Sequence, residues 1–476
     1  MPLTPLTSRR TGRAGNAPRG GRSRTAARRT AVAAGLVTVA AAVLPAPFAR
    51  AGDVGVRCSA AALVAAITTA NQSPGPDVIR LAHRCVYRLE APDPGNPANG
   101  LPVITGELTI EGNDATIKRV HSAPAFRILA VALTGDLTLN KITITGGRAI
   151  DCPTFPGLAV CGGGISSLGA LTVNHSLVTR NVAESATLFA EGGGIDSDGT
   201  GTLNHTVVSH NAARYTGMAL NSADAGGVSN DGPLTVRRSR LIHNKVRVSD
   251  NSGGFAFGAG LSSFAPTTVA DSEISGNQAF AQGGTARAAL ANAVPVTSTM
   301  VVTDTVFRHN TASAPGGTAQ GAAIASNARL SLVGGLISEN RTSATGGTAQ
   351  GGALRVGPVG DVALFETTVR DNKAHAPGGT AEGGGIQVPL GGTLTTDKTY
   401  IVHNTASAAP GGTALGGGLF NEGTSTLNRS HVLYNRADDG GGIYEQAGTV
   451  TLSDTIVRYN RPNNCRPPGA VPGCVD

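Results

Sequence analysis

The chain has 476 residues, with 66 glycines, no tryptophan and only 4% aromatic residues. A core built from these residues must consist of thin layers of Val, Ile, Leu and Ala, unlike the core of an ordinary globular enzyme of this size. The formal charge of +7 comes from residues 1–51, which contain nine arginines and no acidic residue. The rest of the chain is nearly neutral, which excludes nucleic acid and acidic membrane surfaces as electrostatic partners.

Residues 1–51 have the pattern of an export signal. Arginines end at Arg28–Arg29, an apolar run follows from Ala31 to about Leu44, and Ala49-Arg50-Ala51 has the small-x-small form of a cleavage site. A membrane tether is the alternative, and the paired arginines leave the Sec and twin-arginine routes both open. No later segment is long and apolar enough to span a membrane. We therefore expect a secreted protein, extracellular or associated with the cell wall, without integral membrane association after signal cleavage.

Residues 52–100 are expected to form an N-terminal cap and a first rung. Ser59 to Ala70 has the pattern of an amphipathic helix with a serine cap, and Leu63 and Ile67 lie on its apolar face. In an exported chain an even number of cysteines indicates disulfides, although six cysteines formally allow other pairings. The sequence-local pairs are Cys58–Cys85, Cys152–Cys161 and Cys465–Cys474. None has metal-site spacing, so we expect neither a metal nor a cofactor.

Residues 101–462 contain the decisive signal, an internal repeat marked by asparagines. The residue three positions before each asparagine is apolar, as in Val208 and Ile274, and a second apolar row follows glycine or alanine, as in Val294 and Leu354. Each repeat thus holds three short apolar strands that bury their faces only by stacking on the next repeat. The repeat asparagines are Asn181, Asn211, Asn244, Asn277, Asn310, Asn340, Asn372, Asn404, Asn435 and Asn460.

This pattern predicts an all-β parallel β-helix of about 12 rungs, with an N-terminal capping helix and a disulfide-closed tail over residues 463–476. The right-handed form is expected from the general rule for parallel crossovers. The asparagines are expected to occupy left-handed turn positions and to bond to one another through their side-chain amides along the row.

Two motifs carry a resemblance to known proteins. Gly351-Gly352-Ala353-Leu354 and Phe307-Arg308-His309-Asn310 resemble the repeats of chlamydial polymorphic outer-membrane proteins. Residues 55–476, including an opening rung over Cys58 to Leu89, resemble the right-handed parallel β-helix repeat-containing exported proteins of high-GC Gram-positive bacteria, in the pectin-lyase-like superfamily. The resemblance implies the fold and, because most such proteins have no assigned activity, implies little about function.

Charged residues stand six positions before the asparagines and form the best catalytic candidates. Stacking places Arg238, Asp271 and Asp304 on consecutive rungs, where neighbouring carboxylates would shift a pKa or attract a cation. The alternative is a solvated turn with compensating charges. Similarly, His210 and His243, just before asparagines, are interpreted as solvent-facing turn residues.

The segments after the asparagines are expected to be loops, and those between Ala212 and Ala293 carry the aromatic ligand-binding candidates. These are Tyr215, Phe255, Phe257 and Phe280, which either form a ligand-binding face or fold back as local core. The sequence favours a non-catalytic binding or surface-interaction protein whose partner is a polysaccharide or a cell-surface protein. The alternatives are a polysaccharide lyase or glycoside hydrolase, and a structural component of the cell envelope.

Overall fold

The computed structural model describes residues 52–476, apart from 152–153, 156–157, 160, 188, 218–221, 250–252 and 293–298. The contacts divide the chain into Met1–Pro47 and Phe48–Asp476, and the second unit contains all of the described residues. The predicted export signal and its cleavage site lie outside the described residues.

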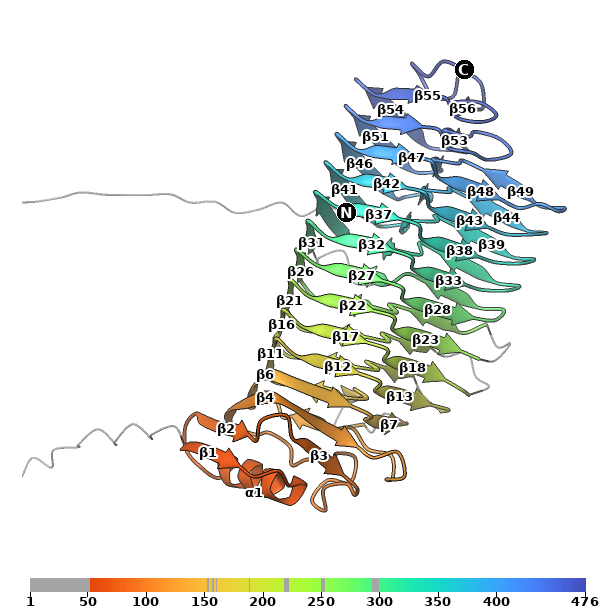
Figure 1. The fold of residues 1–476 in the computed structure, drawn as a ribbon. Helices are drawn as coiled ribbons and strands as arrows, with labels where there is room; N and C mark the ends of the chain where they lie inside the picture. Colours follow the sequence, from red (N-terminus) through yellow and green to blue (C-terminus); the bar gives the residue numbers. More distant parts are fainter. Residues whose placement is uncertain are drawn as a thin grey trace, which may run out of the picture. The chain divides into compact units, whose positions relative to one another are not determined.

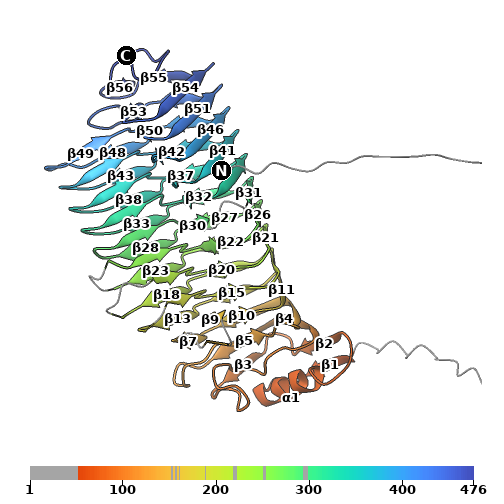
Figure 2. The ribbon, with the colours of Figure 1, turned by 180° about the vertical axis from the view of Figure 1, so that it is seen from behind.

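Stacked coils of short strands form the unit (Figures 1 and 2). One coil runs through β24 (Phe255–Phe257), β25 (Leu261–Ser263), β26 (Thr267–Ala270), β27 (Glu273–Ser275) and β28 (Gln278–Ala281). Each strand pairs in parallel with its equivalents in the coils before and after, as Leu261 does with Val228 and Leu290. The chain is therefore a parallel β-solenoid, of about ten turns. Sheet B has 12 strands, as many as the rungs expected, while the coils at both ends lack strands of sheets C and D.

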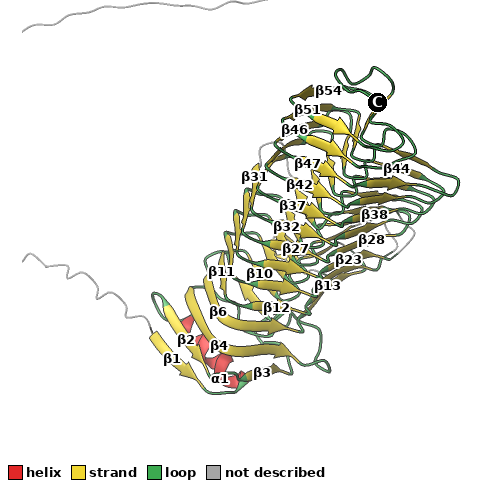
Figure 3. Cartoon of the chain, turned by 45° about the horizontal axis from the view of Figure 1, so that its top comes forward, coloured by secondary structure: helices red, strands yellow, loops and turns green. Residues whose placement is uncertain are grey.

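Four parallel sheets and one two-stranded antiparallel pair contain the described strands. Figure 3 shows the strands in yellow, stacked coil upon coil. The first arm of sheet A comprises β1 (Gly52–Val56), β2 (Asp77–Leu81), β4 (Glu107–Arg119), β6 (Asp136–Thr145), β11 (Ala170–Asn174), β16 (Gly201–Asn204), β21 (Leu234–Arg237), β26, β31 (Thr299–Thr303), β36 (Arg329–Val333), β41 (Asp361–Phe365), β46 (Thr393–Asp397), β51 (Thr424–Asn428) and β54 (Thr449–Ser453). Its second arm comprises β3 (Val86–Leu89), β12 (Leu177–Thr179), β17 (Val207–Ser209), β22 (Arg240–Ile242), β27, β32 (Val306–Arg308), β37 (Leu336–Ser338), β42 (Thr368–Arg370), β47 (Tyr400–Val402), β52 (His431–Leu433) and β55 (Ile456–Arg458), while β4 and β6 continue into it.

Sheet B comprises β5 (Leu129–Val131), β10 (Ile165–Ser167), β15 (Ile195–Ser197), β20 (Val228–Asn230), β25, β30 (Leu290–Asn292), β35 (Ile324–Ser326), β40 (Leu354–Val356), β45 (Ile386–Val388), β50 (Leu419–Asn421), β53 (Ile443–Glu445) and β56 (Cys465–Arg466). Sheet C comprises β7 (Arg148–Ile150), β13 (Val182–Ser185), β18 (Ala212–Tyr215), β23 (Lys245–Val248), β28, β33 (Thr311–Ser313), β38 (Arg341–Ser343), β43 (Lys373–His375) and β48 (Thr405–Ser407). Sheet D comprises β14 (Ala190–Glu191), β19 (Ser222–Asp224), β24, β29 (Thr285–Arg287), β34 (Thr318–Gln320), β39 (Thr348–Gln350), β44 (Thr380–Glu382) and β49 (Thr413–Leu415). The antiparallel pair is β8 (Thr154–Phe155) and β9 (Leu158–Ala159).

Two apolar compartments run along the solenoid. The larger one contains the predicted apolar rows, including Val208 and Ile274, both fully buried. The prediction that Val294 belongs to the second apolar row is wrong. Leu290 occupies that position, in register with Leu261 and Ile324. Val294 itself lies outside the described residues.

The smaller compartment lies between sheets C and D. It consists mostly of inward-facing alanines of their strands, such as Ala312 and Ala349. The segments after the asparagines were expected to be loops, but they are largely strands. In the Gly-Gly-Thr-Ala theme the glycines form the turn between sheets C and D, and the alanine is the inward residue of the sheet D strand, as Ala319 is in β34. Such small side chains fit a compartment this thin.

The asparagine row forms the predicted amide ladder. Asn277 is fully buried, and both its backbone N–H and its side-chain amide donate to Oδ1 of Asn310, at 3.0 and 3.1 Å. The amide also donates to the carbonyl of Leu241 in the previous coil at 2.9 Å. The left-handed residue is the one before the asparagine, for example His309 with φ 54°, and not the asparagine as expected.

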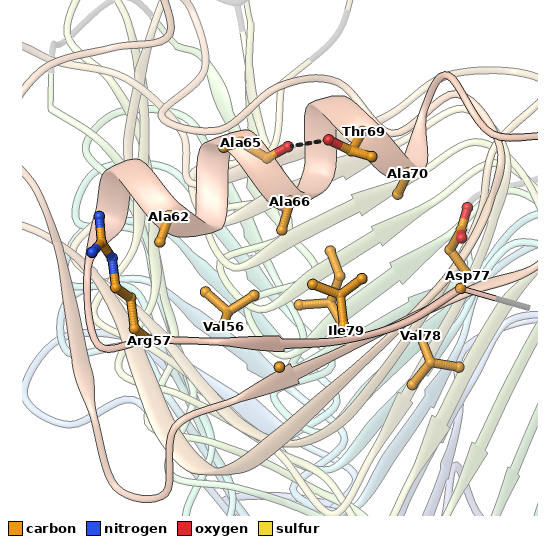
Figure 4. A pocket seen from close by; sticks show the side chains of 13 residues that line it. Val56, Arg57, Ala62, Ala65, Ala66, Thr69, Ala70, Asp77, Val78 and Ile79 are labelled. Carbon is orange, nitrogen blue, oxygen red and sulfur yellow. Dashed lines mark hydrogen bonds between the residues drawn. The ribbon is translucent and has the colours of Figure 1, made fainter.

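At the N-terminal end, α1 (Ala60–Ala70) buries Leu63 and Ile67 in the larger compartment. Ser59 precedes it in an extended conformation, but its side chain makes no capping hydrogen bond, contrary to expectation. A hollow of about 530 Å³ lies between α1 and strands β1 and β2, and Figure 4 shows Ala62 and Ala66 pointing into it. Among the described helices, none is long and apolar enough to cross a membrane.

Each end of the described solenoid contains a disulfide. Cys58 bonds to Cys85 and Cys465 bonds to Cys474, as predicted. Cys152 lies outside the described residues, so its pairing with Cys161 stays a prediction. In the tail, Cys465 and Val471 are part of the larger apolar compartment.

Candidate functional site

The three catalytic candidates lie where the repeat predicts, on consecutive coils. Arg238, Asp271 and Asp304 each occupy a left-handed turn position, with φ between 45° and 50°. The nearest side-chain atoms of Arg238 and Asp271 are 4.0 Å apart, and both side chains are at least half exposed. An exposed pair of this kind contributes about 0–1 kcal/mol to stability, and its charges compensate one another in water. The arrangement matches the solvated turn that was the alternative interpretation.

The four aromatic candidates do not form one face. Tyr215 is fully buried in the alanine compartment, so it cannot be a surface contact for a ligand. Phe280 lies under the guanidinium of Arg247, with 4.9 Å between that group and the ring centroid. Phe255 is 43% exposed on sheet D. Phe257, two residues later, points to the same outer face of the strand but lies at its end next to sheet B, where it lines a hollow that Phe255 does not line.

Glycine turns bring sheets D and B together. The turn between β39 and β40 begins at Gly351 with φ 58°, where a Cβ atom would lie 2.1 Å from the carbonyl oxygen of Leu354. Glycine is the usual residue here, although Ala225 and Ala288 occupy the equivalent position with positive φ in two other coils. The turn places the last residue of each sheet D strand next to the middle residue of a sheet B strand. Contacts between the two rows show this directly: Ser262 donates to Asp224 at 3.1 Å, and Arg355 donates to Gln350 at 3.3 Å.

We call the angle between these two rows the crease. Its sheet D wall consists of Glu191, Asp224, Phe257, Arg287, Gln320, Gln350 and Glu382, and its sheet B wall consists of Ser166, Asp196, Ser229, Ser262, Ala291, Ala325, Arg355, Gln387, Phe420 and Tyr444. The sheet B strands of this wall, among them β10, β15, β20 and β30, are labelled in Figure 2.

Five carboxyl groups gather at the N-terminal part of the crease. Asp196 and Asp224 are only 3% and 2% exposed, and Glu191 is the register partner of Asp224. Asp198 and Asp231 belong to the turns that follow sheet B on these two coils. Oδ2 of Asp196 accepts a hydrogen bond from the backbone N–H of Cys161 at 2.9 Å. Within the described part of the chain, Oδ1 of Asp224 is buried without a partner.

Burial and mutual repulsion set the protonation of this acidic cluster. Burial, with the charges of Asp224, Asp231 and Asp198, raises the pKa of Glu191 to about 9. Burial and the nearby Asp231 raise the pKa of Asp198 to about 6. Burial also raises the pKa of Asp196, Asp224 and Asp231. Near neutral pH the cluster therefore combines a protonated Glu191 with a largely ionised Asp198.

Basic and amide groups follow the acidic cluster along the crease. Arg287 donates to Gln320 at 2.7 Å, and Gln320 donates to Gln350 at 2.8 Å. A hollow of about 220 Å³ lies here between Arg287, Arg355 and Phe257. Among the described residues, no three His, Cys, Asp or Glu side chains are grouped as metal ligands.

The acidic cluster and most of the crease were not predicted from the sequence. The available signal was the recurrence of acidic residues one repeat apart, Glu191 with Asp224 and Asp198 with Asp231. It also missed a ladder of exposed rings beside the asparagine row, in which Tyr434 stacks on His403 and on Tyr459 with centroids 5.1 and 5.2 Å apart.

Comparison of the chain with protein-family models, curated proteins and solved structures finds no match. The assignment of a function therefore depends on the site alone.

Proposed function

We propose that this chain is an exported protein that binds an extended polysaccharide along the crease. The proposal is carried by buried polar atoms that lack partners on separate coils of the crease. They include Oδ1 of Asp224 and both side-chain polar atoms of Gln387, a fully buried residue, as judged within the described residues. A buried polar atom without a partner is destabilising, so a row of them indicates a ligand that supplies hydroxyl groups.

The spread of these groups favours a polymer over a small molecule. Asp224 and Gln387 lie on coils well apart along the solenoid, with Phe257 and the glutamines between them. A linear glycan offers hydroxyls to the amides and carboxyls and C–H faces to aromatic rings. Export is supported by the two disulfides and by the charged and apolar pattern of residues 1–51.

Phe255 and Phe257 provide a matched test because they lie on the same outer face of one strand, while only Phe257 stands at the sheet B end of it and lines the hollow. A polysaccharide microarray with the full chain identifies a ligand, and titration calorimetry then measures its affinity. Phe257→Ala is expected to weaken binding about thirtyfold, as loss of an aromatic anchor typically does. Phe255→Ala is expected to leave the affinity unchanged. Equal losses in both variants, or a loss only with Phe255→Ala, would contradict binding in the crease.

Hydrolysis of a glycosidic bond is the second candidate, and the unlike protonation of Glu191 and Asp198 favours it. Protonated Glu191 would donate its proton to the glycosidic oxygen, and ionised Asp198 would take a proton from the attacking water. Release of reducing ends should then require Glu191 and reach its maximum between about pH 6 and 9, the two pKa values. Glu191→Gln should abolish the release, whereas Asp271→Asn with Asp304→Asn should not change it.

A further inference from the structure

The hollow in the crease arises from two small residues. Ala291 and Ala325 are register partners on consecutive coils of sheet B, and their neighbours in the same row are Ser262 and Arg355. The short side chains leave a hollow of about 220 Å³ beneath the opposite wall. This volume suits one ring-sized ligand group, not a whole polymer chain.

The side chains of two arginines, one from each wall of the crease, line this hollow. Arg287 belongs to the sheet D wall on the coil of Ala291, and Arg355 belongs to the sheet B wall two coils later, a separation of about 10 Å at the usual spacing. Each Nε donates to a glutamine, Arg287 to Gln320 at 2.7 Å and Arg355 to Gln350 at 3.3 Å. These bonds orient the guanidinium groups through Nε and leave their terminal N–H groups for another acceptor.

The described residues provide no ion-pair partner for either guanidinium. Burial lowers the pKa of Arg287 and lowers that of Arg355 to about 10, where the charge of Arg287 adds to the effect. Glu382 and Glu422 oppose this shift only from beyond ion-pair distance. Two partly buried cations that repel one another are destabilising until an anion lies between them.

The rest of the lining fits a sugar ring. Phe257 and Phe264 form an apolar wall, against which the C–H face of a pyranose can pack. Asn292 is 1% exposed and donates to Oγ of Ser326 at 3.2 Å, while its Oδ1 has no partner in the described part of the chain. That oxygen is an acceptor for a hydroxyl group.

We infer that the hollow is a subsite for a sugar residue that carries an oxyanion, held between Arg287 and Arg355 with its ring against Phe257. The inference rests on the proposed binding of a polysaccharide in the crease and specifies the chemical class of that polysaccharide. A sulfate ester and a uronic carboxylate share this chemistry, because each presents two or more oxygens to a guanidinium.

Matched pairs of polymers test the subsite with the full-length chain. Dextran sulfate is compared with dextran, and polygalacturonate with its methyl ester, by titration calorimetry at two salt concentrations. The anionic member of at least one pair is expected to bind about ten- to a hundredfold more tightly, the effect of a hydrogen bond to a charged group. Which pair shows the preference distinguishes sulfate from carboxylate.

Three variants locate the preference. It should be lost in the double variant Arg287→Gln with Arg355→Gln, and also in Ala325→Leu, which fills the hollow without changing any charge. Arg341→Gln, at an exposed position of strand β38, removes one positive charge elsewhere and should retain it. Circular dichroism confirms that each variant folds, and Ala325→Leu keeps the test decisive where the double variant does not fold.

The outcomes separate this inference from the proposed function. Equal affinity for anionic and neutral polymers overturns the subsite but leaves binding in the crease intact. A preference that survives in Ala325→Leu also overturns it, because it then reflects general charge. If no polymer binds, while glucose 6-sulfate or galacturonate raises the melting temperature of the wild type and not of the variants, the subsite stands and the polysaccharide proposal fails.

Discussion

Single residues at the turns account for much of the regularity of this solenoid. All ten residues that precede the repeat asparagines have positive φ, between 54° and 64°, although their side chains range from histidine to glycine. The strain of these positions is offset by the asparagine that follows. The side chain of Asn277, for example, bonds to two backbone groups of the previous coil and to the side-chain oxygen of Asn310 in the next coil. The residue before the asparagine thus adopts the left-handed conformation, and the hydrogen bonds of the asparagine stabilise it.

Removal of one ladder residue should be strongly destabilising. In Asn277→Ala, the carbonyl of Leu241 loses one donor, and the backbone and amide N–H groups of Asn244 lose this acceptor. Each buried group left without a partner costs about 1–3 kcal/mol, so a loss of about 3 kcal/mol or more is expected in urea denaturation. Asn428→Ala, on the outer side of β51, is the control and should change stability by less than about 0.5 kcal/mol. Similar losses in the two variants would show that the ladder is not energetically special.

The acidic cluster should make stability fall as pH rises. The pKa of Glu191 is about 9 in the folded chain against an ordinary 4.5, so its stabilising effect is complete below pH 4.5 and is lost as pH rises toward 9. Asp198 acts in the same direction between 3.8 and about 6. Each group lowers the free energy of unfolding by at most about 1.4 kcal/mol per pH unit within its window.

Urea denaturation at pH 4.5, 6 and 8 measures this dependence. Glu191→Gln should reduce the slope, whereas Asp304→Asn, an exposed carboxylate outside the cluster, should not. A stability that rises from pH 4.5 to 8 would mean that the cluster is ionised in the folded chain.

At the scale of strands, the sequence predicts those strands whose inward residues are large and apolar. The rows represented by Val208 and Ile274 recur at fixed positions, and this recurrence alone is enough to predict the strands of sheets A and B. The strands of sheets C and D escape such a prediction because their inward residues are alanines, which do not mark a strand in an alternating pattern. The crease was missed for the same reason, since it depends on sheet D folding against sheet B.

Overpacking of the alanine compartment tests this account of sheets C and D. Ala349 is fully buried between Ala319 and Ala381 of the neighbouring coils. Ala349→Leu should lower the free energy of unfolding by about 1–3 kcal/mol, because a rigid thin layer cannot accept three extra carbon atoms. Thr348→Val, one residue earlier and facing the other side, should have little effect. Tolerance of leucine at Ala349 would show that these strands are loosely packed.

At the scale of the described solenoid, each coil contacts mainly its neighbours, so stability is distributed coil by coil and the end coils depend on one side only. The disulfides Cys58–Cys85 and Cys465–Cys474 lie in terminal coils, and the second of them holds the tail against the last coils. A disulfide of this kind typically contributes about 2–4 kcal/mol. Its removal should therefore loosen the end without melting the middle.

Hydrogen exchange can resolve this difference. In the double variant Cys465→Ser with Cys474→Ser, amides of β53 and β56 should lose protection, whereas those of β25 and β30 should exchange as in the wild type. The reason is that opening a terminal coil exposes one interface, while opening a central coil exposes two. The variant Cys58→Ser with Cys85→Ser is the matched control and should loosen β2 and β3 instead. A uniform loss of protection in either variant would mean that the coils unfold as one cooperative unit.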